Sequence, residues 1–312
     1  MKKSIQGAAA VLILLLLLSH PHLAYEGAKN GLLLWSQTVL PTLLPFMICS
    51  NVIVALDAIH LLTWPFKPLL THVLKLSPAG SYILISGLLC GYPMGAKTCS
   101  EFLEDNRITG QEASYLLSIC NHPSPMFLLG YVAGCMASNI PMAFLLIALY
   151  LPILPLSLLS RRYYGIHGAC QGVVRKPDKA LSFDKTMMSS VEVMVKIGGY
   201  IMLFSILACF LQTLLKDYGA SQAVLLGVVE ITTGIQSLSF HMTGPAQALA
   251  IVAVTAFGGM SGIFQTNSVL SENAKKAGLS IRHYILWKML HSAVSCLILI
   301  LLLAAFPQVP GR

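Results

Sequence analysis

The stretch Ser86-Gly-Leu-Leu-Cys-Gly-Tyr-Pro-Met-Gly-Ala-Lys97 decides how the rest of the chain is interpreted. It begins as an apolar run, is interrupted by Gly91, Pro93 and Gly95, and ends on Lys97. A membrane helix satisfies its own backbone, so such an interruption persists only where protein or a water-filled cavity supplies partners. A lysine beside it is costly in lipid and marks a candidate site. The alternative interpretation is a tight turn at the membrane surface, with the lysine in cytosolic water.

The composition is that of a membrane protein. The 312 residues are 56% hydrophobic and 10% charged, with a mean hydropathy of +0.75. A soluble domain carries about 25% charged residues. We therefore expect an all-α polytopic membrane protein in a bacterial cell membrane.

The charged residues and cysteines exclude several function classes. The net charge of +8 comes without a basic helix or an aromatic-interleaved basic patch, so no nucleic-acid partner is expected. The eight cysteines are scattered without a C-x-x-C pair and are interpreted as small core residues. Catalytic-triad, metal-ligand and phosphate-loop spacings are absent from the sequence, which predicts neither an enzyme nor a metal or cofactor site.

The first half predicts a series of membrane segments. Residues 1–26 form an N-terminal transmembrane helix or signal anchor, and a span kinked by two prolines follows at 31–56. An interfacial helix at 60–76 leads into a re-entrant hairpin at 79–103, which contains the interrupted stretch. The next helix, 113–136, is split at Asn121-His-Pro-Ser-Pro125 and capped by Thr109, and 141–160 closes the half.

The second half repeats this plan after a basic loop, 161–185, which is the strongest cytoplasmic marker. The expected segments are a long helix, a hairpin broken at Thr232-Thr-Gly-Ile-Gln236, a helix split at Phe257-Gly-Gly-Met-Ser-Gly262, and a last span. Their ranges are 186–215, 223–242, 246–272 and 284–305.

The order of the segments predicts an inverted-topology repeat. With the amino terminus in the cytoplasm, most lysines and arginines fall on the inner side, as the positive-inside rule requires. Residues 27–160 then form a first transport repeat and 186–306 a second, each with one re-entrant hairpin and one broken transmembrane helix. In secondary transporters such interrupted segments meet near the bilayer midplane and form the substrate site.

Several residues near the interruptions are candidates for that site. The half-helices that start after Gly95, Pro125 and Gly262 present amino termini, which attract anions, and Lys97 adds a positive charge. Glu230, in an apolar arm, could bind a cation, relay a proton or pair with Lys97. The neutral candidates are Asn121, Ser124, Gln265, Thr266 and Asn267. The alternative role for each of them is to form hydrogen bonds with backbone groups that the helix interruption leaves unpaired.

Two further positions have a structural alternative. His122, beside the second break, could donate to a carboxylate or carry a proton, and could equally serve as the partner of a freed carbonyl. Glu192 and Lys196 are spaced for an intrahelical ion pair, and a structural role is favoured for them.

Several phrases resemble the YlbJ-type (stage V sporulation protein V-like) sporulation integral membrane proteins. They are Val39-Leu-Pro-Thr-Leu-Leu-Pro-Phe46, Gly91-Tyr-Pro-Met-Gly-Ala-Lys97, Asn121 to Pro125, Ile197-Gly-Gly-Tyr-Ile201 and Glu230-Ile-Thr-Thr-Gly234. This family carries the nucleoside-recognition "Gate" domain and is similar in plan to concentrative nucleoside transporters. The resemblance implies transport of dipicolinic acid, an aromatic dicarboxylate, across the outer forespore membrane.

The positions carried over from the resemblance are Gly91, Pro93, Gly95, Lys97, Asn121, Glu230, Gly234 and Gln236. The chain looks shorter than typical members, and His122-Pro123 stands where a small polar pair is expected.

The sequence thus favours a transporter of a small organic anion. A transporter of nucleosides or related neutral polar solutes is the alternative, and a non-transporting sporulation assembly protein acting through the 161–185 loop is a second one. The bilayer and an anionic small molecule are the expected partners. Proton or cation coupling and self-association into a homo-oligomer stay open.

Overall fold

A computed structural model describes residues 2–56, 58–136, 140–166 and 183–306, and within these ranges the chain is helical, without strands. Five helical segments are long and apolar enough to cross a bilayer, whose hydrocarbon core needs about 20 residues of helix. They are Pro21–Ala55, Met142–Tyr163, Met187–Leu214, Gly244–Val269 and Ile281–Ala305. This agrees with the predicted all-α polytopic membrane protein.

The first half begins with α1 (Lys2–Ser19) and a long helical segment made of α2 (Pro21–Leu34), the π-helical turn η1 (Trp35–Val39) and α3 (Leu40–Ala55). The π-helical turn directly precedes Pro41, where the sequence predicts a kink. The short elements α4 (Ile59–Thr63), η2 (Trp64–Phe66) and η3 (Pro68–Val73) occupy the predicted interfacial helix. The boundary between α1 and α2 lies at His20, before the predicted start of the first repeat at residue 27.

The predicted hairpin and broken helix follow in order. The hairpin is α5 (Pro78–Cys90) and α6 (Met94–Glu104), and the broken helix is α7 (Gly110–Ile119) followed by α8 (Pro125–Phe127), η4 (Leu128–Val132) and α9 (Ala133–Cys135). Thr109 accepts the backbone N–H of Glu112, which confirms the predicted cap. The Glu112 carboxylate accepts the Ser77 N–H. Two helices, α10 (Met142–Tyr150) and α11 (Ile153–Tyr163), close the half.

The second half contains the same kinds of element. The long helix is α12 (Phe183–Leu214), the hairpin is α13 (Gly219–Val229) and α14 (Ile231–His241), and the split helix is α15 (Gly244–Phe257) and α16 (Gly259–Val269). The turn η5 (Lys216–Tyr218), α17 (Glu272–Lys276) and α18 (Ile281–Ala305) complete the chain. Of the predicted basic loop, residues 167–182 lie outside the described residues. The order of elements is therefore as predicted, while its interpretation as an inverted repeat stays a prediction.

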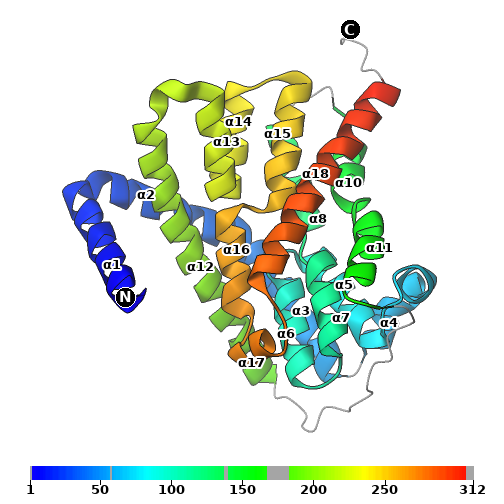
Figure 1. Cartoon of the computed structure of the whole chain (residues 1–312). Helices are drawn as coiled ribbons and strands as arrows, with labels where there is room; N and C mark the ends of the chain where they lie inside the picture. Colours follow the sequence, from blue (N-terminus) through cyan, green and yellow to red (C-terminus); the bar gives the residue numbers. More distant parts are fainter. Residues whose placement is uncertain (1, 57, 137–139, 167–182, 307–312) are drawn as a thin grey trace.

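The two hairpins occupy opposite ends of the helical bundle (Figure 1). The helices α13 and α14 lie in the upper part of the view, α5 and α6 lie in the lower part, and α12 runs from one part to the other. Helix α12 packs against α2 and α3 of the first half and against α13 and α16 of the second. Gly27 and Gly31 let the backbones of α2 and α12 approach closely, because an added Cβ would overlap the α12 backbone. The four interruptions consequently lie between the ends of the bundle.

Candidate functional site

The interruption of the first hairpin lies between Cys90 and Met94. Gly91 has a φ of 84°, a conformation that favours glycine, and its Cα lies against Ser124 of the second interruption. The Tyr92–Pro93 peptide is cis. Pro93 occupies the N-cap position of α6 and makes no side-chain cap. The predicted break is therefore confirmed at Gly91–Pro93, and α6 begins at Met94 rather than after Gly95.

The second interruption covers residues 120–124, between α7 and α8. Ser124 accepts the Phe127 N–H and caps the new helix, which continues from Pro125 through Cys135. The Asn121 amide donates to Thr266 (2.8 Å) and Tyr284 (2.9 Å), while its Oδ1 has no hydrogen-bond partner among the described residues. Asn121 thus ties this break to α16 and α18.

The second hairpin is interrupted at Glu230 alone. Glu230 has an extended backbone, and its Oε2 accepts both the Thr233 N–H (2.7 Å) and the Thr232 hydroxyl. The predicted break at 232–236 is wrong, because this side-chain cap lets α14 begin at Ile231. Gly234 instead lies directly on Gly227 of α13, where an added Cβ would overlap backbone atoms. The predicted alternative of a Lys97–Glu230 pair is also wrong, since Lys97 pairs with Glu101 of its own helix.

The fourth interruption is confined to Gly258, between α15 and α16. Gly258 and Gly259 have φ values of 86° and 68°, and α16 already includes residues 260–262. The predicted break through residue 262 is therefore too long. The Tyr92 hydroxyl donates to the Thr255 carbonyl (3.0 Å), and its ring packs on Gly258. This contact brings the first and fourth interruptions together.

A cavity lies where three of these interruptions converge. It has a volume of about 80 Å³ available to the centres of water-sized molecules, and a single water needs about 10–15 Å³ by the same kind of measure. Its wall includes residues of the first, second and third interruptions and of α2, η1, α3, α12 and α16. The lining residues are Leu34, Thr38, Val39, Thr42, Leu43, Cys90, Gly91, Tyr92, Pro123, Ser124, Phe127, Ile201, Glu230, Ile231, Thr232 and Gln265.

Four predicted site residues meet in this cavity: Gly91, Ser124, Glu230 and Gln265. Glu230 is 2% exposed, and its Oε1 accepts no hydrogen bond from the described residues. The Gln265 amide donates to Ser261 (3.0 Å). The lining thus combines one buried carboxylate, several hydroxyls and a mainly apolar surface.

A second, more polar hollow adjoins the cavity and shares Leu34 and Thr232 with it. Gln236, another predicted site residue, lines this hollow and not the central cavity. Its remaining walls come from α2, α12, α14 and η4. The lining residues are Asn30, Leu33, Leu34, Tyr131, Ser205, Gln212, Thr232, Thr233, Gln236, Ser237, Phe240 and His241.

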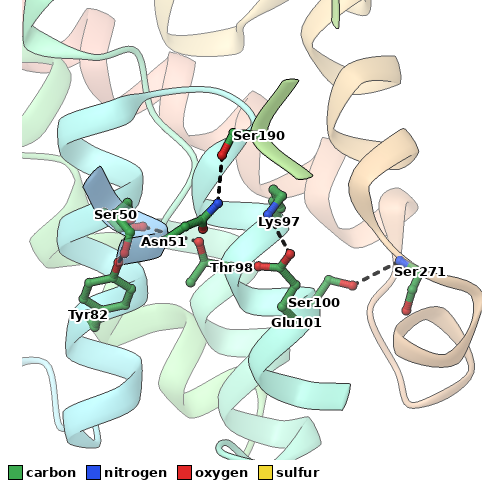
Figure 2. Close-up of polar contacts among 10 residues, drawn as sticks. Ser50, Asn51, Tyr82, Lys97, Thr98, Ser100, Glu101, Ser190 and Ser271 are labelled. Carbon is green, nitrogen blue, oxygen red and sulfur yellow. Dashed lines mark hydrogen bonds and ion pairs between the residues drawn. The ribbon is translucent and has the colours of Figure 1, made fainter. Parts of the chain in front are cut away.

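Lys97 does not line the cavity. It lies in the first turn of α6, is 5% exposed, and its Nζ donates to Glu101 (2.6 Å) one turn further along the same helix. Figure 2 shows this pair beside Ser100, which accepts the Ser271 N–H from the segment before α17. The structure therefore pairs Lys97 within α6, next to the hydrogen bond by which Ser100 joins α6 to the second half.

The remaining predicted residues have packing roles or lie outside the cavity. Gly95 packs against the Cys120 carbonyl, where an added Cβ would overlap backbone. His122 is buried against the Ile119 carbonyl, which matches its predicted structural alternative. Asn267 is half-buried near the end of α16. The expected Glu192–Lys196 pair is confirmed at 2.7 Å.

The sequence-based analysis missed Tyr92 and Lys288. Lys288 is 2% exposed in the first third of α18, and its Nζ donates to the Tyr92 hydroxyl (3.1 Å) and the Asn121 carbonyl (3.2 Å). A lone lysine inside the apolar span predicted at 284–305 is a signal that could have identified it. Within the described part of the chain, no group of three or more His, Cys, Asp or Glu side chains could hold a metal ion.

Comparison with known proteins gives one informative similarity. The chain is 27% identical over 297 aligned positions to the sporulation integral membrane protein YlbJ of Bacillus subtilis, covering 82% of this chain and 72% of that protein. No family model matches the chain, and no solved structure matches it. The similarity supports a YlbJ-type assignment, and together with the five apolar helices it supports an integral membrane protein related to sporulation.

Proposed function

We propose that this integral membrane protein transports a small organic anion and that dipicolinate is its solute. The observation that carries the proposal is the convergence of three half-helix amino termini on one cavity. They are the starts of α6, of the helix Pro125–Cys135 and of α14, next to the lining residues Tyr92, Ser124 and Glu230. Helix amino termini carry partial positive charge and unsatisfied N–H groups, so they favour anions, and they form the substrate sites of secondary transporters.

The chemistry of the wall suits an aromatic dicarboxylate. Such a solute has apolar ring faces and charged oxygens at its edge. Leu34, Val39 and Phe127 supply apolar surface, while Ser124 supplies a hydroxyl at the start of the helix Pro125–Cys135. Small-molecule sites commonly combine an apolar lining with a few placed polar groups.

The sporulation context supports this choice of solute. The resemblance to YlbJ-type proteins implies movement of dipicolinate across the outer forespore membrane, and the similarity to a sporulation membrane protein is consistent with it. We place the protein in that membrane with its amino terminus in the cytoplasm. The basic residues of the segment 161–166 would then lie on the cytoplasmic side.

A second candidate is a transporter of nucleosides or related neutral polar solutes. The observation that favours it is that Glu230 lines the cavity with one carboxylate oxygen that accepts no hydrogen bond from the described residues. Such an oxygen is a strong acceptor for the hydroxyl groups of a neutral solute. In addition, the lining residues include neither lysine nor arginine. The two candidates therefore differ in the charge of the solute that the cavity holds.

Uptake into proteoliposomes tests the proposal. We expect saturable uptake of radiolabelled dipicolinate, and we expect Thr42→Trp, which fills the cavity, to abolish it. Thr213→Trp is the matched control, since Thr213 is exposed near the end of α12. Uptake of uridine without dipicolinate would establish the second candidate instead. Uptake of neither solute by the folded protein would overturn the transporter proposal.

A further inference from the structure

Lys288 is a buried lysine directly behind the cavity wall. Its Nζ donates to the hydroxyl of Tyr92 and to the backbone carbonyl of Asn121, and it lies 4.9 Å from the centroid of the Tyr92 ring. Tyr92 lines the cavity, and Asn121 precedes two residues that line it, Pro123 and Ser124. The side-chain nitrogen of one lysine on α18 therefore contacts both the first and the second interruption.

The surroundings of Lys288 satisfy a neutral amine better than a charged one. A neutral amine has two N–H groups, and two neutral acceptors are present. An ammonium has three N–H groups, and among the described residues no carboxylate lies within 4.0 Å of it to offset the charge. A buried charge without a partner is costly. The two acceptors around the Lys288 Nζ thus match the two N–H groups of a neutral amine.

His291, one turn after Lys288, has the opposite arrangement. Its Nε2 lies 2.9 Å from the Leu149 carbonyl oxygen and its Nδ1 lies 3.3 Å from the Ala256 carbonyl oxygen. Carbonyl oxygens only accept hydrogen bonds, and a neutral imidazole has a single N–H. Both contacts are therefore satisfied only by the protonated ring.

His122 completes the cluster as a neutral ring. Its Nε2 donates to the Ile119 carbonyl (2.6 Å), and its Nδ1 has no hydrogen-bond partner among the described residues. Its ring stands edge-on to that of His291, with centroids 4.6 Å apart. A proton added at Nδ1 would find no acceptor, so His122 contributes polarity but not a second charge.

We infer that Lys288 and His291 share one proton and that the uptake and release of this proton are coupled to movement of the solute. Positive charges on two buried residues one turn apart on α18 would repel each other, so the pair holds one proton rather than two. Gain or loss of a proton at Lys288 would change the hydrogen bonds that Lys288 makes to Tyr92 and Asn121. The protonation state would thereby act on two segments that shape the cavity. This inference rests on the proposed function, and it names the proton as the ion that is coupled to transport of the solute.

The elements packed around Lys288 supply further titratable groups but no carboxylate in contact with it. The hairpin α5–α6 contributes a tyrosine, the interruption after α7 a cysteine and a histidine, α10 a tyrosine, and α18 a tyrosine and a histidine. These groups are Tyr92, Cys120, His122, Tyr150, Tyr284 and His291. Tyr92, Tyr150 and Tyr284 all use their hydroxyls in hydrogen bonds to neutral groups.

The test uses the full chain in proteoliposomes that contain a pH-sensitive dye. Downhill uptake of dipicolinate by the wild type should move protons, and an imposed pH gradient should drive dipicolinate accumulation. Dipicolinate uptake without any proton movement, and without a response to the pH gradient, would overturn the inference and leave the proposed function intact. Absence of dipicolinate uptake in the folded wild type would overturn the proposed function itself.

Variants identify the groups that carry the proton. Lys288→Gln and His291→Gln should retain exchange of labelled for unlabelled dipicolinate at equal pH, and should lose accumulation driven by the pH gradient. Lys196→Gln, an exposed lysine on α12 paired with Glu192, is the matched control and should behave as the wild type. Accumulation at the wild-type level in both cluster variants would contradict the assignment. If either variant does not fold, the other variant and the proton measurement on the wild type still test whether transport is coupled to protons.

Discussion

Gly95 of α6 packs so closely against Cys120 that a Cβ at this position would overlap the Cys120 carbonyl oxygen. Gly87 of α5 approaches the same carbonyl in the same way. Both arms of the first hairpin therefore hold the interruption of the neighbouring helix in place. This close packing fixes the wall of the cavity, because Gly91 and Ser124 meet immediately beyond it.

Substitution of Gly95 by alanine should therefore destabilise the protein. The overlapping atoms belong to backbone, which cannot move aside as a flexible side chain can, and overpacking of this kind costs about 1–3 kcal/mol. Thermal unfolding in detergent, followed by size-exclusion chromatography, measures the effect. Gly130→Ala is the matched control, since nothing lies within 4 Å of its added Cβ. Equal stability of the two variants would show that the hairpin does not pack on Cys120 as described.

The Glu230→Gln variant distinguishes a transporter of an anionic solute from a transporter of a neutral one. Glutamine keeps an oxygen that can accept the Thr233 N–H, so α14 should retain its cap and the variant should fold. Removal of the negative charge should lower the KM for dipicolinate by roughly three- to ten-fold, as about 1 kcal/mol of like-charge repulsion at a partly hydrated site would predict. Initial rates of uptake at several dipicolinate concentrations provide the measurement.

Glu192→Gln, which removes an exposed carboxylate on α12, is the control for general effects of charge. A higher KM for dipicolinate in Glu230→Gln would contradict the anion proposal. Weaker uridine uptake in the same variant, with dipicolinate unaffected, would favour the neutral-solute candidate.

Lys97→Ala tests a residue that the sequence predicts in the solute site and that the structure places outside the cavity. Because Lys97 pairs with Glu101 away from the cavity, the KM for dipicolinate should not change. The loss of an i,i+4 pair whose acid is 44% exposed should cost less than about 1 kcal/mol of stability. Lys275→Ala, which breaks the exposed pair with Glu272, is the control. If Lys97→Ala lost dipicolinate uptake while its thermal stability was unchanged, Lys97 would belong to the solute site and this account would be contradicted.

The positions of two interruptions could be predicted from the sequence because particular residues enforce them. Pro123 and Pro125 prevent α7 from continuing, and Gly91 supplies a backbone conformation that other residues adopt only with strain. The interruption at Glu230 was misplaced, because threonines and a glycine resemble a turn. In the structure Gly234 is helical, and its missing side chain lets α13 and α14 touch.

The candidate site was predicted in part for a similar reason. Gly91, Ser124 and Glu230 lie at interruptions, and residues at interruptions face the cavity. Lys97 was assigned to the site from its nearness in sequence, but the rotation of α6 about its axis is set by packing against Cys120 and α16. Lys288 is distant in sequence from every interruption, so only the crossing of α18 brings it to Asn121.

The most direct test of the cavity as the solute site is protection of a cysteine placed within it. Thr42→Cys, in the wall beside Glu230 and Ser124, would be labelled with a small methanethiosulfonate reagent, and peptide mass spectrometry would give the labelling rate at position 42. We predict that saturating dipicolinate slows this rate several-fold and that it leaves the rate at the exposed native Cys49 unchanged. An equal rate at position 42 with and without dipicolinate, in protein that transports it, would contradict the assignment of the solute to this cavity.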